Sequence, residues 1–168
     1  MKTFKITAVF LMAAMLSGCA SNYKLGTTLP KELRDVYVPS VKNESGEPMI
    51  DLSATPTVLR EVRREGTLSI TDESRAVTRL DVTIKSFEMK PVRYSSTSAD
   101  KPQEYRATIK ADVIFRRRDT GAVLFTGEVT GDETFEDTGD LVSAKQRVVP
   151  EALEDLSEDI VDRCISVW

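Results

Sequence analysis

Apolar side chains occupy every second position of the chain between Ala107 and Phe115, and most of the residues between them are polar. A period of two is typical of a β-strand that buries one face and leaves the other in water. The turn sequence Asp119-Thr120-Gly121 follows, and an apolar segment resumes at residues 123–129. We therefore predict an antiparallel hairpin in a sheet that is covered on one side only.

Three further strands are predicted where β-branched and aromatic residues recur, at residues 35–39, 68–71 and 80–92. In the third of these, the alternation of apolar residues changes parity between Ile84 and Phe87. One extra residue restores the parity, so we predict a β-bulge near Ser86.

Residues 143–165 carry apolar side chains at spacings of three and four, which is the period of an amphipathic α-helix. This stripe consists of Val149, Leu153, Leu156, Ile160 and Cys164. We interpret Cys164 as a small buried hydrophobic residue rather than a reactive thiol. Pro150 is expected to kink the helix or to mark the start of its second half.

A second helix is expected to begin at Thr55, whose hydroxyl can cap it, with Pro56 in the first turn. Gly66 is typical of the left-handed residue that ends a helix. These elements predict an α+β fold, a small two-layer sandwich in which two helices cover a mostly antiparallel sheet. We expect residues 31–168 to form its single domain.

The N-terminus has the order of a secretory signal. Two lysines precede an apolar run that is too short to span a bilayer. The run ends in Leu16-Ser17-Gly18-Cys19, which resembles a bacterial lipobox. We predict a signal peptide over residues 1–18, acylation of Cys19 as the first mature residue, and a tether over residues 19–30. Stable anchoring requires more than one acyl chain.

Composition excludes several classes of function. Removal of residues 1–18, which hold two lysines and no acid, lowers the formal net charge from −4 to −6. An acidic chain is a poor ligand for nucleic acid, so no nucleic-acid partner is expected. The chain has no histidine, which excludes Ser-His-Asp and Cys-His catalysis and removes a common zinc ligand. We expect no cofactor, no metal and no enzymatic activity.

Residues 131–140 form an acidic, glycine-containing segment. Asp132 and Glu136 are the carboxylates that a hydrolase of envelope glycans would use there. We interpret the segment as a solvated loop rather than an active site.

Five arginines are candidate contacts for an anionic glycolipid or a protein partner: Arg93, Arg106, Arg116, Arg117 and Arg118. Guanidinium groups suit bidentate contacts with phosphate or carboxylate. The last three arginines end a predicted strand, whereas Arg93 and Arg106 flank the loop at the other end of the hairpin. The alternative interpretation is that these charges protect strand ends against aggregation.

Several short segments, in this order and spacing, together resemble the LptE family of lipoproteins. They are Cys19 with Tyr23-Lys24-Leu25-Gly26, Val36-Tyr37-Val38-Pro39, Asn43 with Glu47-Pro48, Arg64-Glu65-Gly66-Thr67-Leu68, Pro91-Val92-Arg93-Tyr94, Glu104-Tyr105-Arg106-Ala107-Thr108 and Asp119-Thr120-Gly121-Ala122-Val123-Leu124.

The resemblance implies an outer-membrane lipoprotein that plugs an LptD-type β-barrel and takes part in the assembly and transport of lipopolysaccharide to the cell surface. Lipopolysaccharide itself is a further candidate partner. Ala20 follows the acylated cysteine where aspartate would favour retention in the inner membrane, and this favours the periplasmic side of the outer membrane.

A second function stays open at this point. Residues 36–39 with Asn43 and Gly46 are also similar to the opening of periplasmic lipoproteins that activate a cell-wall (peptidoglycan) synthase. The partner of such an activator would be an inner-membrane enzyme rather than a β-barrel.

Overall fold

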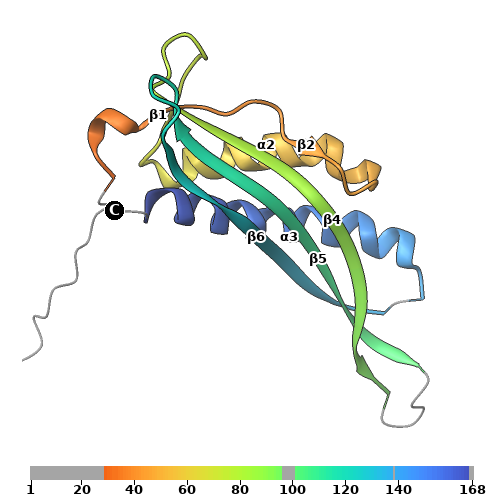
Figure 1. The fold of residues 1–168 in the computed structure, drawn as a ribbon. Helices are drawn as coiled ribbons and strands as arrows, with labels where there is room; N and C mark the ends of the chain where they lie inside the picture. The colour runs from red at the N-terminus through yellow and green to blue at the C-terminus, as the bar shows by residue number, and fades with distance from the viewer. Residues whose placement is uncertain (1–28, 96–100, 138, 167–168) are drawn as a thin grey trace, which may run out of the picture.

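Three long antiparallel strands form the centre of the sheet: β4 (Thr78–Tyr94), β5 (Pro102–Arg117) and β6 (Val123–Glu136). The computed structural model describes residues 29–95, 101–137 and 139–166. The strands are strongly twisted, and two long helices lie side by side on one face of the sheet (Figure 1). The predicted hairpin is confirmed: β5 pairs with β6, and Gly121 in the turn has a φ of 70°.

Three short strands widen the sheet at one end. β1 (Asp35–Tyr37) runs parallel to both β3 (Ser69–Ile70) and β4, while β2 (Lys42–Asn43) runs parallel to β4 farther along. The sheet of the described residues therefore has six strands in the order β3-β1-β4-β5-β6, with β2 beside β4. The predicted α+β class with a mostly antiparallel sheet is confirmed.

The change of parity in β4 is a register shift, as predicted. Ile84 pairs with Ala111, whereas Phe87 pairs with Ile109, and the shift falls between Ile84 and Ser86. The extra residue keeps Phe87 and Met89 on the same face of the sheet as Ile84. The strand therefore covers the core at one end and extends past the helices at the other (Figure 1).

Helix α3 (Leu141–Ile165) covers strands β5 and β6. Its predicted stripe is confirmed, because Val149, Leu153, Leu156, Ile160 and Cys164 are all buried. Burial also raises the pKa of the Cys164 thiol to about 12, which disfavours the reactive thiolate. The helix runs without interruption through Pro150, so the structure has no separate second half that starts at this residue. Pro150 is exposed, so its ring meets water rather than the sheet.

Helix α2 (Pro48–Glu65) begins earlier than the sequence predicted. The expected start at Thr55 and Pro56 is wrong, because both residues lie inside the helix. The carboxylate of Glu47 caps the helix by accepting from Met49 N, and Pro48 occupies the first turn. The Thr55 hydroxyl instead accepts from Val41 N at 2.9 Å and ties the helix to the chain between β1 and β2.

The predicted end of this helix is confirmed at Gly66, which has a φ of 81° and donates its N–H to Val62 O. The N-terminal ends of the two helices are joined by an ion pair between Lys145 Nζ and Glu47 Oε2 at 2.7 Å. The same ammonium lies 5.5 Å from the ring centroid of Phe87 on β4. The N-terminal ends of the two helices therefore lie close together on the sheet.

The interpretation of residues 131–140 as a solvated loop is wrong for their first half, since β6 continues to Glu136. Gly131 lets α3 pack closely against this part of the strand. A Cβ atom at this position would lie 2.4 Å from Ala152 O and 2.5 Å from Leu156 Cβ, so only glycine lets α3 rest directly on the strand. Asp155 of α3 then accepts from Asp132 N at 2.9 Å and covers the sheet edge.

Replacement of Gly131 by alanine is therefore expected to destabilise the fold by about 3 kcal/mol, in the upper part of the range for overpacked cores. Gly127→Ala is the matched control in the same strand, because its Cβ would meet only Phe125 at 3.4 Å. We expect the control to change the free energy of unfolding by less than about 1 kcal/mol. Urea unfolding of both variants measures the difference, and equal values would contradict the close contact.

Candidate functional site

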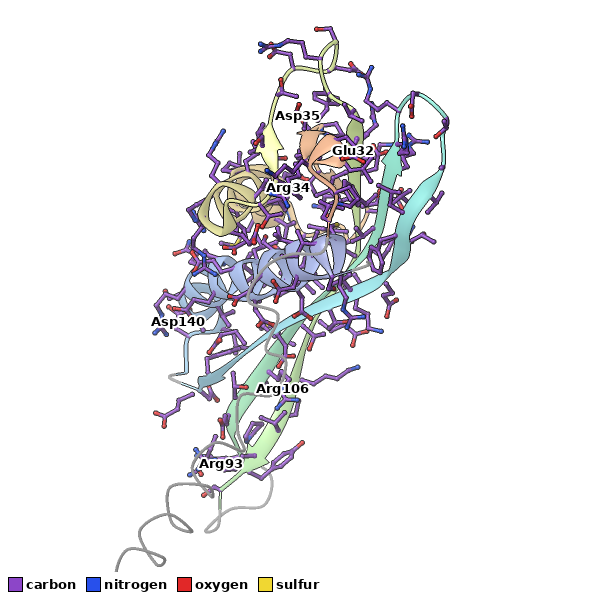
Figure 2. The ribbon with its side chains drawn as sticks, turned by 90° about the vertical axis from the view of Figure 1, so that its left-hand side faces the viewer. Glu32, Arg34, Asp35, Arg93, Arg106 and Asp140 are labelled. Carbon is purple, nitrogen blue, oxygen red and sulfur yellow. The ribbon has the colours of Figure 1, made fainter. Side chains whose placement is uncertain are left out.

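The domain has two distinct ends, and the five candidate arginines are divided between them. The base contains η1 (Lys31–Leu33), β1 and the turn at residues 119–121. The tip contains residues 87–94 and 102–107 with the end of β6, and its far end extends beyond the helices (Figure 1). Figure 2 shows Glu32, Arg34 and Asp35 at the base, whereas Arg106 and Arg93 lie toward the tip.

At the base, Arg116, Arg117 and Arg118 line one shallow pocket of about 170 Å³. Arg79 and Gly121 complete its lining. Arg79 was not among the predicted site residues, because it belongs to a different strand. The pairing of β4 with β5 places it directly opposite Arg116. This strand register, rather than a local sequence motif, brings Arg79 to the pocket.

Asp81 orients two of these guanidinium groups. Its Oδ1 accepts from Arg79 Nε at 2.8 Å, and its Oδ2 accepts from Arg116 Nη2 at 3.0 Å. The hydrogen bond that Arg79 donates to Asp81 is the main cause that raises the pKa of Arg79. Arg79 also pairs with Glu73 and lies 5.4 Å over the ring of Tyr37.

Arg117 and Asp119 form a two-point contact across the turn. Arg117 Nε and Nη2 donate to the two carboxylate oxygens at 3.0 and 2.6 Å. The guanidinium lowers the pKa of Asp119 to about 2, helped by the N–H of Thr120. The neighbouring Arg118 instead donates to the carbonyl oxygens of Glu73 and Ala76.

At the tip, both arginines pair with acids. Arg93 Nε lies 2.9 Å from Glu104 Oε2, and Arg106 Nε lies 3.4 Å from Asp132 Oδ2. Beside them, the rings of Tyr105 and Phe135 stack with their centroids 5.7 Å apart. Exposed apolar side chains, Val92 and Tyr94, lie on the same projecting strand.

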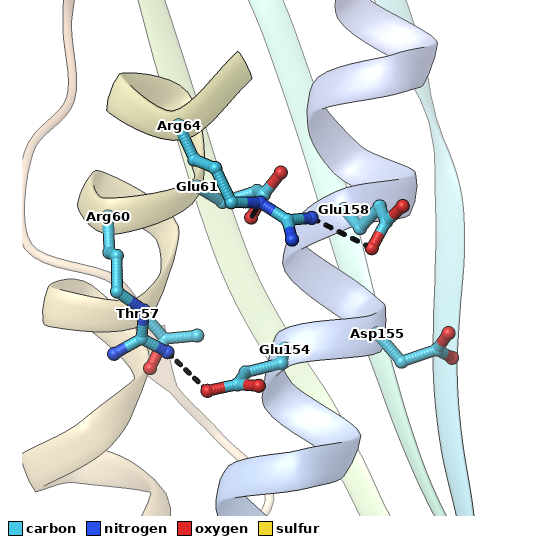
Figure 3. Close-up of a pocket in the computed structure, with 7 residues that line it drawn as sticks. All are labelled: Thr57, Arg60, Glu61, Arg64, Glu154, Asp155 and Glu158. Carbon is cyan, nitrogen blue, oxygen red and sulfur yellow. Dashed lines mark hydrogen bonds and ion pairs between the residues drawn. The ribbon is translucent and has the colours of Figure 1, made fainter.

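A groove between the helices is lined mainly by charged side chains (Figure 3). Arg60 pairs with Glu154 at 2.7 Å, and Arg64 pairs with Glu158 at 3.0 Å. Arg64 also pairs with Glu61 of its own helix. These side chains satisfy one another, so the groove joins α2 to α3 rather than offering a ligand site. Exposed pairs of this kind contribute at most about 1 kcal/mol each.

The carboxylates Asp132 and Glu136 are not arranged for glycan hydrolysis. They are four residues apart on one strand, which separates them by about 13 Å. Paired glycosidase carboxylates lie roughly 5–9.5 Å apart. Within the described parts of the chain, no group of three or more potential metal-ligating acids or thiols is present.

Cys19, the predicted lipid attachment, lies outside the described residues. Among the residues that the structure describes, neither helix is long and apolar enough to cross a membrane.

A comparison with protein families identifies the chain. The model of the LptE family, described as lipopolysaccharide-assembly, matches residues 33–164. The chain belongs to the LptE family. It is thus a lipoprotein of lipopolysaccharide assembly, and the family is non-enzymatic. No curated protein matches the sequence significantly.

Solved structures share the fold at low sequence identity. Protein XCC0632 from Xanthomonas campestris is 14% identical with a TM-score of 0.60, and the match covers 83% of this chain and 88% of that chain. The hypothetical protein CT253 from Chlamydia trachomatis is 8% identical with a TM-score of 0.56, covering 76% and 93%. At these identities the likeness shows the fold alone.

The contact between Arg117 and Asp119 predicts the acid behaviour of the base. Because the pKa of Asp119 is lowered to about 2 from its ordinary 3.8, the pair stabilises the fold above pH 3.8. This contribution is lost as the pH falls through about 2. NMR titration of the Asp119 carboxyl should give a midpoint near 2, and Arg117→Gln should raise it toward 3.8. Arg60→Gln, on α2, should leave the midpoint unchanged; the same rise in both variants would contradict the pairing.

Proposed function

We propose that this LptE-family chain is anchored to the periplasmic side of the outer membrane by acyl chains on Cys19 and partners an LptD-type β-barrel. Together the two proteins would deliver lipopolysaccharide to the cell surface. The family match over residues 33–164 is the observation that carries the proposal. The lipobox-like sequence before Cys19 supports the anchor.

The open face of the sheet supports a partner with a polar interior. Even-numbered residues of β5 point away from the helices, because their odd-numbered neighbours are buried. On this face, cations of β5 pair with acids of both neighbouring strands: Arg116 with Asp81, Lys110 with Glu128 and Arg106 with Asp132. A charge-balanced surface of this kind suits the polar lumen of a transmembrane barrel.

The tip supplies the candidate contacts to the barrel or to glycolipid. Arg93 and Arg106 lie toward this end (Figure 2), and the exposed side chains Val92 and Tyr94 are on the same strand as Arg93. Arginines next to aromatic and apolar side chains are typical of protein interfaces. We propose that this end contacts the barrel wall or a phosphorylated glycolipid that passes it.

The proposal is tested by crosslinking the full-length lipoprotein in cells and identifying the main partner by mass. A stoichiometric large β-barrel, together with reduced surface lipopolysaccharide on depletion, is the expected result. A matched purification from cells that carry Arg93→Gln and Arg106→Gln shows whether the tip contributes to binding of the barrel. Recovery of an inner-membrane cell-wall synthase, with the barrel intact after depletion, would contradict the proposal and favour the activator function.

The lipid anchor is tested separately with Cys19→Ser. We expect this variant to keep the fold, since the domain begins after the tether, but to leave the membrane fraction. Membrane fractionation with immunoblotting measures the change. Ser17→Ala, a conservative change before the cysteine, is the control and should remain with the membrane. Full retention of Cys19→Ser in membranes would show that acylation at this residue is not the anchor.

A further inference from the structure

The chain enters the fold at the base, next to the arginine pocket. Arg34 donates from Nε and Nη2 to Leu29 O at 3.2 and 3.0 Å. The Thr78 hydroxyl then donates to the carbonyl oxygens of Leu33 and Asp35. In the sheet, Thr78 pairs with Arg117. The first described residues are therefore fixed to the same end of the sheet as the pocket.

The length of the tether decides which end of the domain can face the anchoring membrane. Nine residues, 20–28, separate Cys19 from Leu29, and the ten Cα–Cα steps between the two span at most about 35 Å. β4 runs from the base to the tip over 17 residues, or roughly 50 Å at about 3.3 Å per residue. A domain standing on its tip would hold Leu29 beyond the reach of the tether, whereas a domain standing on its base would not.

Charge favours the same end. Without the predicted signal peptide, the chain carries a formal net charge of −6, and the outer side of α3 is rich in acids. An anionic leaflet therefore repels most of the protein surface. The base instead gathers four arginines in one pocket. The side chains of Arg116 and Arg117 remain 44% and 36% exposed.

The carboxylates of the pocket leave donors free for another anion. A guanidinium group has five N–H donors, and Asp81 takes only one hydrogen bond from Arg116. Asp81 and Asp119 thus orient the guanidinium groups without saturating them. A phosphate group with several acceptor oxygens can bind the remaining donors in bidentate geometry.

We propose that the pocket of Arg79, Arg116, Arg117 and Arg118 binds the phosphates of phospholipid headgroups in the leaflet that holds the Cys19 acyl chains. This contact would stand the domain on its base and point the tip away from that leaflet. The inference rests on the proposed lipid anchor, but not on the identity of the barrel partner.

The test uses the mature acylated protein in vesicles of phosphatidylcholine with and without phosphatidylglycerol, both containing a headgroup-labelled quencher lipid. One fluorophore is attached through Thr120→Cys at the base and, in a second sample, through Gln103→Cys at the tip. The buried thiol of Cys164 does not compete for the label. In the anionic vesicles, we expect the base label to be quenched several-fold more strongly than the tip label.

Paired variants identify the groups responsible. Arg116→Gln with Arg117→Gln should abolish the extra quenching at the base, because both side chains are exposed and contribute little to the core. Arg93→Gln with Arg106→Gln makes the same change of charge at the tip and should leave the quenching as it was. Circular dichroism confirms that the two labelled proteins and the two double-arginine variants are folded.

Two other outcomes would overturn the inference, and they can be told apart. Protein that does not float with the vesicles contradicts the acylation of Cys19, and the orientation with it. If the protein floats but both labels are quenched equally, the phosphate pocket is refuted. The same holds if the quenching of the base label does not change in the variant with Arg116→Gln and Arg117→Gln. Either result leaves the lipid anchor in place.

Discussion

The direct contact of α3 with the long strands is the interaction on which the rest of the structure depends. Gly131 lets the helix backbone approach β6, because any side chain there would overlap Ala152 and Leu156. The approach buries the stripe that includes Leu153 and Ile160 against strands that offer fully buried apolar side chains of their own. Since hydrophobic burial is the main favourable term in folding, this layer fixes where α2 can pack and which face of the sheet stays open.

A sheet that is covered on one face has a polar second face, and this asymmetry positions the functional surfaces. Along β5 every second side chain enters the core, and the alternate ones form ion pairs across the strands, such as Lys110 with Glu128. The helices are also shorter than the long strands, so the strands continue past the ends of the helices (Figure 1). The far end of the tip is therefore not covered by a helix, while the base holds the first described residues, Leu29 to Leu33, against the sheet.

Periodicity in the sequence predicted the elements with long, regular patterns. The alternation over residues 107–115 and the stripe that ends at Cys164 are found as expected. Local signals were less informative where tertiary contacts compete with them. Thr55 has the side chain of a helix cap, but its hydroxyl accepts a hydrogen bond from the backbone of Val41. The acidic residues after Gly131 are typical of a loop, but they belong to β6, which pairs with β5. The pocket at the base depends on the register between β4 and β5, which places Arg79 opposite Arg116. No local sequence motif encodes this register.

Stability and recognition are carried by different parts of this molecule. The apolar layer under α3 holds the fold, whereas Arg93, Arg106, Arg116 and Arg117 stand in largely exposed ion pairs, which stabilise a protein by at most about 1 kcal/mol each. Such pairs can exchange a carboxylate for a phosphate or for an acid of a partner at little cost in folding free energy. Arg117 at the base and Arg93 at the tip each have a carboxylate within 3 Å that keeps the guanidinium oriented before a ligand arrives. Preorganised donors lose less conformational entropy on binding, so the intramolecular pairs prepare both ends for anionic partners.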